Sequence, residues 1–325
     1  MHLHSHFILQ SRIHKLKSFG RDNVFVKRDD ELSSGITGSK YRKFASLLPY
    51  ISQNNFDEIL IIGSAQSNNV AGLLQLLNEN NVKASLMLLE SNEADKRGNL
   101  LWMHLLYDMA AAIWVKREDW KNVNELAKNY ASNEYQLHGK NVFVVEEGCA
   151  VPQALPGAIT LADDILQYEA MEETIFNNIF IDSGSGTAAI GLLYGLALAG
   201  SAYRSVYITL IAGTEAEFTQ QYKKLIKAAA GIYNLPEKYF GGNIYFSRSL
   251  LAPSFGSITT QVLEEVKNIA LSEGILAEPV YTAKHFYTAR KIIQQNNLQG
   301  NSLIINSGGS LGLAGFQEKL NKVVK

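Results

Sequence analysis

One lysine of this chain has a setting from which it could do chemistry. Lys40 lies near the end of stretch 33–43, which reads Ser-Ser-Gly-Ile-Thr-Gly-Ser-Lys-Tyr-Arg-Lys, and a helical pattern follows it. A helix N-terminus disfavours positive charge, and an amine must lose a proton before it can form a Schiff base. The position of Lys40 is therefore a first indication of pyridoxal phosphate chemistry. A solvated lysine is the ordinary alternative at such a place.

Residues 183–187 (Ser-Gly-Ser-Gly-Thr) have the composition of an anion-binding loop. They follow a buried strand expected at 178–182 and precede a helix of small residues expected at 188–199. In such a loop the backbone N–H groups converge on phosphate oxygens, and the helix N-terminus adds partial positive charge. No lysine follows the loop, so it is not a Walker A motif. The pattern predicts a phosphate site, although tight packing of strand on helix would use the same glycines.

Three further polar stretches lie at junctions between expected elements. Ser67-Asn68-Asn69 separates a strand from a helix and could bind a substrate carboxylate or simply cap the helix. Tyr281 lies at the end of a short strand expected at 279–282, and open α/β sheets place ligands at strand ends. A core tyrosine is the alternative there. Ser307 begins a Ser-Gly-Gly turn, where its hydroxyl could face a ring nitrogen.

These stretches are set in a regular alternation of strands and helices. Continuous apolar runs predict buried parallel strands, and the alternation predicts an α/β fold with parallel sheets. Strands or extended segments are expected at 23–27, 58–62, 84–89, 110–115, 142–145, 178–182, 205–212, 239–246, 279–282 and 302–306. Helices are expected from about 43 to 48 with Pro49 as the limit, and at 70–77, 98–107, 119–130, 155–172, 188–199, 215–233, 258–273, 285–295 and after 312.

The composition excludes several classes of protein. The chain has 325 residues with a net charge of -1, so two domains fit and no basic field points to nucleic acid. No apolar stretch is long enough for a membrane span, and the N-terminus does not resemble a signal peptide. Cys149 is the sole cysteine, so an internal disulfide is impossible. A cytoplasmic enzyme without a metal fits best; a frayed terminus is the favoured interpretation of the alternating His2, His4 and His6.

Together the motifs resemble the fold-type II pyridoxal-phosphate enzymes, and more narrowly the 1-aminocyclopropane-1-carboxylate (ACC) deaminase and D-cysteine desulfhydrase family. The order and spacing of the motifs hold over nearly the whole chain. The matching stretches are 26–30 (Val-Lys-Arg-Asp-Asp), 37–43 (Thr-Gly-Ser-Lys-Tyr-Arg-Lys), 63–68 (Gly-Ser-Ala-Gln-Ser-Asn), 98–101 (Gly-Asn-Leu-Leu), 185–192 (Ser-Gly-Thr-Ala-Ala-Ile-Gly-Leu), 279–284 (Pro-Val-Tyr-Thr-Ala-Lys) and 307–313 (Ser-Gly-Gly-Ser-Leu-Gly-Leu).

The resemblance implies how the cofactor, pyridoxal 5'-phosphate, would be held. Lys40 would bind it covalently as a Schiff base, and Asn68 would hydrogen-bond its phenolic oxygen. Ser307, with Thr282, would face its pyridine nitrogen. A neutral hydroxyl favours a protonated ring less than a carboxylate would, which suits β-elimination. The residues that would bind the phosphate are Ser183, Gly184, Ser185, Gly186 and Thr187.

The resemblance also implies the substrate side and the architecture. Ser67, Asn68 and Asn69 would hold a substrate carboxylate, and Tyr281 would line the substrate side; Lys40, Ser67 or Tyr281 would transfer protons. The fold would be tryptophan synthase β-like, with two three-layer parallel-sheet domains and the site in the cleft between them. The larger domain would join residues 1–45 to 160–325, the smaller would span 46–159, and the protein would be a homodimer.

Within the family, Thr282 favours D-cysteine desulfhydrase, since the ACC deaminase pattern has Glu after the tyrosine. The expected reaction is β-elimination of a small amino acid to pyruvate, ammonia and sulfide, with ACC deamination as the alternative. Racemisation stays possible, as does a cofactor-binding protein without turnover. A nicotinamide-binding Rossmann protein is a weaker rival, since no acidic residue ends strand 205–212. The positions that depart from the family pattern are Ser39, Asn69, Cys149 with its neighbours, and Ser307.

Overall fold

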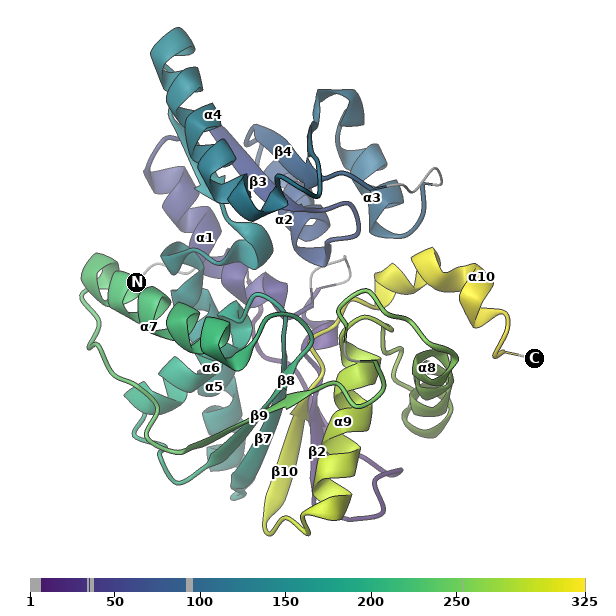
Figure 1. The fold of residues 1–325 in the computed structure, drawn as a ribbon. Helices are drawn as coiled ribbons and strands as arrows, with labels where there is room; N and C mark the ends of the chain where they lie inside the picture. Colours follow the sequence, from purple (N-terminus) through teal and green to yellow (C-terminus); the bar gives the residue numbers. More distant parts are fainter. Residues whose placement is uncertain (1–6, 34, 36–37, 92–95, 253, 325) are drawn as a thin grey trace.

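The structure is a computed structural model, and it describes residues 7–33, 35, 38–91, 96–252 and 254–324. His2, His4 and His6 lie outside the described residues, as do Ser34, Ile36 and Thr37 of the loop before Lys40. Two separate sheets organise the chain, one of six strands and one of four (Figure 1). The expected α/β fold with two parallel-sheet domains is confirmed.

The six-stranded sheet has the order β1-β2-β10-β7-β8-β9 and is parallel except for β1, which runs antiparallel to β2. The sequence pattern did not predict β1, because three residues are too few to show an alternation. The strands of this sheet are β1 (Ile13–Lys15), β2 (Val24–Lys27), β7 (Phe176–Ser183), β8 (Ser205–Leu210), β9 (Asn243–Arg248) and β10 (Asn301–Ile305).

Helices cover both faces of this sheet, which makes three layers (Figure 1). One face, with Ile179 and Ile181 of β7, packs against α5 (Leu155–Met171), α6 (Thr187–Leu198) and α7 (Glu215–Tyr233). The other face, with Phe180 and Ile304, packs against α8 (Thr260–Glu273) and α9 (Thr282–Gln295). Burial on both faces explains why these strands read as continuous apolar runs.

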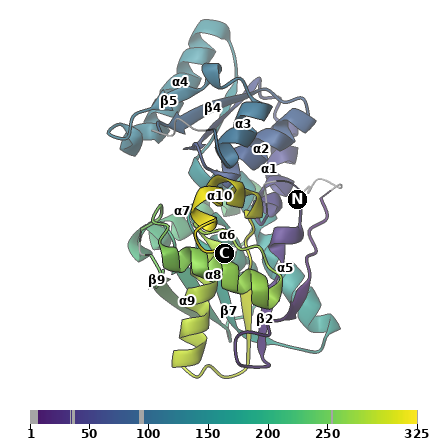
Figure 2. The same cartoon turned by 90° about the vertical axis from the view of Figure 1, so that its right-hand side faces the viewer.

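The four-stranded sheet is wholly parallel and has the order β5-β4-β3-β6. Its strands are β3 (Glu58–Ser64), β4 (Ala84–Leu89), β5 (Ile113–Val115) and β6 (Val142–Val145). Helices α1 (Lys40–Gln53), α2 (Asn68–Glu79) and α3 (Asn99–Leu106) cover one face, and α4 (Val123–His138) covers the other (Figure 2). The predicted domain boundaries fall inside α1 and α5, and they stay predictions.

Short 3-10 helices connect several of these elements, and the chain closes on α10 (Gln317–Leu320). The 3-10 helices are η1 (Asp29–Glu31), η2 (Met109–Ala111), η3 (Trp120–Asn122), η4 (Glu147–Cys149), η5 (Pro152–Ala154) and η6 (Ser310–Phe316). None of the helices in the described part of the chain combines the length and the apolarity needed to cross a membrane.

Two sequence-based expectations about local structure are wrong. Pro49 does not end the first helix but lies inside α1, which continues to Gln53. Leu47, Leu48 and Ile51 are buried around it, and this packing offsets the backbone hydrogen bond that a proline removes. Residues 279–282 do not form a strand end, because α9 starts directly at Thr282 with Tyr281 as its N-cap.

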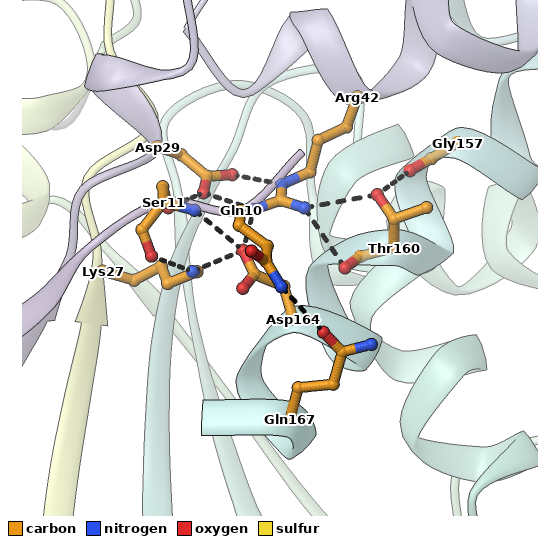
Figure 3. Close-up of polar contacts among 9 residues, drawn as sticks. All are labelled: Gln10, Ser11, Lys27, Asp29, Arg42, Gly157, Thr160, Asp164 and Gln167. Atoms are coloured by element: carbon orange, nitrogen blue, oxygen red, sulfur yellow. Dashed lines mark hydrogen bonds and ion pairs between the residues drawn. The ribbon is translucent and has the colours of Figure 1, made fainter. Parts of the chain in front are cut away.

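A buried cluster of charges anchors α1 on the large sheet (Figure 3). Arg42, in the first turn of α1, binds both oxygens of Asp29 at 2.7 Å and also Oδ2 of Asp164 at 2.7 Å. Lys27 of β2 pairs with the same Asp164 oxygen at 2.5 Å. Because Arg42 follows Lys40 by two residues, this cluster determines where α1 begins relative to the large sheet.

Candidate active site

A cavity of about 750 Å³ lies between the two sheets, at the ends of their strands. Residues from both sheets line it, as ligand sites in open α/β folds require. The sequence-predicted site residues that line it are Lys40, Ser67, Asn68, Asn69, Ser183, Gly184, Ser185, Gly186, Thr187, Tyr281 and Ser307. Thr282 is the one predicted site residue that does not.

Lys40 is the first residue of α1 and reaches into this cavity. Its Nζ lies 5.9 Å from the centre of the Tyr281 ring. Burial lowers the pKa of Lys40, against the opposing charges of Asp182 and Glu278. A lysine with a lowered pKa is more often the neutral amine that Schiff-base formation needs.

Tyr281 lies against Gly184 of the loop 183–187. A Cβ added to Gly184 would be 2.9 Å from Cε1 of the Tyr281 ring, so a larger residue than glycine would displace the ring. Burial raises the pKa of Tyr281, and the negative charges of Glu278 and Asp182 raise it further. The phenol therefore stays protonated near neutral pH, and it can donate a proton more readily than accept one.

The loop 183–187 has the geometry of an anion site. Gly186 adopts φ 87°, a left-handed conformation that favours glycine, and α6 begins at the next residue, Thr187. The loop also touches the small domain, since Ser185 Oγ donates to the carbonyl oxygen of Gly148 at 3.2 Å. The N-terminus of α6 therefore directs its N–H groups at the cavity between the domains.

The three polar residues at the start of α2 divide their roles. Ser67 caps the helix, because its Oγ accepts the N–H of Val70 at 3.2 Å. Asn69 accepts from Lys43 Nζ through Oδ1 at 3.3 Å, and its buried Nδ2 has no partner in the described structure. The helix cap and the carboxylate site were alternatives in the sequence; the cap is observed, and the carboxylate site stays a prediction.

Asn68 is oriented by a residue from the next helix. Its Oδ1 accepts from Asn99 Nδ2 at 2.8 Å, and Asn99 also donates to the carbonyl oxygen of Gln66 at 2.9 Å. The amide nitrogen of Asn68 thus faces away from Asn99. A Cβ added to Gly309 would be 3.0 Å from it. Only a glycine at 309 leaves this donor accessible.

The hydroxyl groups of Ser307 and Thr282 were both expected to face a ring nitrogen, but in the structure each binds a protein group. Ser307 lines the cavity, but its Oγ donates to Oδ2 of Asp182 at 3.1 Å. Thr282 is fully buried, and its Oγ1 accepts the N–H of Glu278 at 2.7 Å and donates to the Glu278 carbonyl oxygen at 3.2 Å. The Thr282 hydroxyl is therefore committed to the turn before α9 and does not reach the cavity.

Two buried carboxylates that line the cavity were missed by sequence reasoning. Glu278 accepts from the N–H groups of Val280 at 2.7 Å, Tyr281 and Thr282, and burial raises its pKa to about 7. Asp182, near the end of β7, lines the cavity with Oδ1 unpartnered in the described structure. A charged residue ending an otherwise apolar strand was the signal that could have identified Asp182.

Cys149, next to the cavity, is fully buried with φ 61°. Burial raises the pKa of its thiol to about 11, against the charge of Lys43. This thiol is therefore protonated and inert at neutral pH, in keeping with the expectation of a small buried side chain.

The residues present fit pyridoxal phosphate. A glycine loop at a helix N-terminus can take the phosphate, and the Asn68 amide can take a phenolic oxygen. The buried Asn69 Nδ2 and Asp182 Oδ1 are polar atoms that a bound molecule could satisfy. Lys40 supplies the amine between them.

Comparisons with known proteins agree with this fit. No family model matches the chain. A Pyrococcus horikoshii protein named "Putative 1-aminocyclopropane-1-carboxylate deaminase" is 28% identical over 94% of this chain and 89% of its own. A rice (Oryza sativa subsp. japonica) protein named "Putative D-cysteine desulfhydrase 2, mitochondrial" is 23% identical over 92% of this chain and 80% of its own. The crystal structure of an ACC deaminase homologue superposes with a TM-score of 0.82 at 22% identity, over 98% of this chain and 95% of that one. In sequence this chain is thus similar to proteins named as ACC deaminases and D-cysteine desulfhydrases, and it shares the fold of an ACC deaminase homologue.

Proposed function

We propose that this protein is a pyridoxal-phosphate-dependent lyase that eliminates the β-substituent of a small amino acid, with D-cysteine as the favoured substrate. The observation that carries the proposal is Lys40 at the first turn of α1, which lines the cavity with its Nζ 5.9 Å from the centre of the Tyr281 ring. The names of the sequence relatives support the same reaction class. A homodimer, which rests on the resemblance, and a cytoplasmic location, which rests on the composition, belong to this proposal.

When bound, the cofactor supplies an electron sink that stabilises negative charge at the substrate's α-carbon. Lys40 holds the cofactor and then, as a neutral amine, takes the α-proton. Asn69 Nδ2 and the Ser67 hydroxyl bind the substrate carboxylate and so fix which proton faces Lys40. Tyr281, kept protonated by burial, provides a proton near the leaving group.

The overall reaction with D-cysteine consumes one water and yields pyruvate, ammonia and hydrogen sulfide. The second candidate is ACC deamination, which the names of several relatives favour. Thr282 favours D-cysteine over ACC, because the ACC deaminase pattern has Glu at this position. The structure adds that the Thr282 hydroxyl is held by Glu278 and is absent from the cavity lining. Thr282 therefore distinguishes the two branches by sequence pattern and not by contact with the substrate.

The test is pyruvate release by purified, cofactor-loaded protein, with D-cysteine, L-cysteine, β-chloro-D-alanine and ACC offered separately. Lys40→Ala should abolish turnover of D-cysteine or β-chloro-D-alanine. Lys128→Ala, on the exposed side of α4, is the matched control and should retain it. Turnover of ACC alone would select the second candidate. Absence of turnover despite a visible absorption band from the bound cofactor would identify a binding protein.

A further inference from the structure

Asp182 is a buried carboxylate that forms no ion pair with any described residue. It is 8% exposed and stands one residue before the end of β7. Oδ2 accepts one hydrogen bond, from Ser307 Oγ at 3.1 Å, whereas Oδ1 has no hydrogen-bond partner in the described structure. Among the described residues no cation lies within ion-pair distance of it. Buried carboxylates are normally paired, so Asp182 needs an explanation.

The sheet places Asp182 and Ser307 side by side. β10 is the neighbour of β7, and Ile304 pairs with Phe180, so the chain just after β10 is level with Asp182. On its other side β7 pairs with β8, where Thr209 is opposite Asp182. β7 and β10 end at the cavity, and Asp182 and Ser307 line it.

The ionisable groups nearby do not provide a permanent partner. His285 of α9 binds Thr209 Oγ1 through Nδ1 at 2.9 Å, and burial lowers its pKa, so its ring is neutral near neutral pH. Glu278 is the other buried carboxylate that lines the cavity, but it binds three backbone N–H groups. Lys40 is the amine that the proposed function assigns to the cofactor. Of the two carboxylates, Asp182 is thus the one with an oxygen free to bind a ligand.

We propose that Asp182 would accept a hydrogen bond from the protonated pyridine nitrogen of the cofactor and so keep that ring protonated. Ser307 is then a positioning residue. Its hydroxyl donates to Oδ2 and holds the carboxylate in place, and the hydrogen bond from the ring nitrogen goes to Asp182 and not to Ser307. This inference rests on the proposed function, because it presupposes a bound pyridoxal phosphate.

The consequence concerns the range of substrates. A protonated pyridine ring withdraws electrons more strongly than a neutral one. It therefore stabilises negative charge at the α-carbon more strongly. The serine at 307, taken alone, suggested a neutral ring and a reaction restricted to substituents that leave quickly. If Asp182 holds the ring in its protonated form, the enzyme should also act on substrates with poorer leaving groups.

The experiment uses the full chain loaded with pyridoxal phosphate labelled with ¹⁵N at the ring. The ¹⁵N resonance of the wild type should lie at the position of a protonated pyridine and show one-bond coupling to hydrogen. Asp182→Asn should move it to the position of a neutral pyridine, because loss of a facing carboxylate lowers such a pKa by about one to three pH units. A neutral nitrogen in the wild type, or a protonated one in Asp182→Asn, overturns the proposal.

Two further variants separate Asp182 from its neighbours. Ser307→Ala removes the hydroxyl but keeps the carboxylate, so the nitrogen should stay protonated. Loss of the proton in Ser307→Ala but not in Asp182→Asn would assign the role to the hydroxyl instead. Glu278→Gln changes the other buried carboxylate and should also leave the nitrogen protonated.

The same samples distinguish a failure of this inference from a failure of the proposed function. A visible absorption band that borohydride abolishes, with the cofactor left permanently attached to Lys40, shows that the cofactor is bound as proposed, whichever state the nitrogen has. Absence of that band overturns both proposals. Unfolding of the cofactor-free proteins provides a control for structure: Asp182→Asn should unfold at the same temperature as the wild type or higher, since it removes an unpaired buried charge. A large loss of stability there would mark Asp182 as structural.

Discussion

Replacement of Arg42 by methionine should be among the most destabilising single changes in this protein. Its guanidinium is 1% exposed and makes three hydrogen bonds of 2.7 Å, two to Asp29 and one to Asp164. Two contacts to Thr160, at 3.2 and 3.3 Å, complete its donors. Methionine fills similar space but leaves two buried carboxylates without their main partner.

The expected cost follows from what remains after the change. Removing one member of a buried ion pair typically costs about 3 to 5 kcal/mol. Here Asp164 keeps Lys27 at 2.5 Å, and Asp29 keeps the Ser11 hydroxyl at 2.8 Å. These remaining contacts place the expected loss at the lower end, about 3 kcal/mol. Arg42→Lys keeps the charge without the two-pronged contact and should lose less.

The assay is urea unfolding of the cofactor-free protein at neutral pH, with Arg12→Met as the matched control. Arg12 also binds both oxygens of a carboxylate, that of Glu31, but its side chain is 66% exposed. An exposed pair contributes about 0 to 1 kcal/mol. Equal losses in the two variants would refute the argument that burial determines the cost.

The pH dependence provides a second check on the same variant. Burial alone would raise the pKa of Asp29, but the adjoining Arg42 outweighs it and holds that pKa below the ordinary 3.8. A carboxyl with a lowered folded pKa stabilises the protein above pH 3.8, and this contribution is lost as the pH falls through the folded value. The difference between wild type and Arg42→Met should therefore shrink below pH 3.8. A difference that is independent of pH would show that packing, and not charge, is responsible.

Two other substitutions follow from the site. Gly148→Ala should weaken cofactor binding about tenfold or more in an absorbance titration, because its Cβ would lie 2.3 Å from Cβ of Ser185 in the phosphate loop. The control Gly139→Ala has the same backbone strain, φ 66° against 67°, but nothing within 4 Å; it should lose about 1 kcal/mol of stability and bind normally. Burial lowers the pKa of Lys43 from 10.5 to about 8, so the unfolded chain binds more protons than the folded one between these values, and stability rises with pH there. Lys43→Met should flatten that rise in unfolding curves of the cofactor-free protein; an unchanged slope would show that Lys43 is charged when buried.

Much of the fold was predictable, because its signals are local. Apolar runs of five to eight residues identified β3, β4, β7, β8 and β10 within one or two residues of their observed ends. The helix expected at 215–233 coincides with α7, whose Thr214 and Glu217 form a capping box. The error at Pro49 came from a local rule that long-range packing overrides.

The sequence by itself determined the alternation of strands and helices, the lysine at a helix start and the glycine loop at a second one. Each of these depends on residues that are neighbours along the chain, so their chemistry can be read without coordinates. The tertiary structure alone decided how distant groups share protons and charge. Ser307 and Asp182 are 125 positions apart, and only the pairing of β10 with β7 brings hydroxyl and carboxylate together. Likewise the hydroxyl of Thr282 binds Glu278, because the buried N–H group of Glu278 in the turn before α9 needs an acceptor.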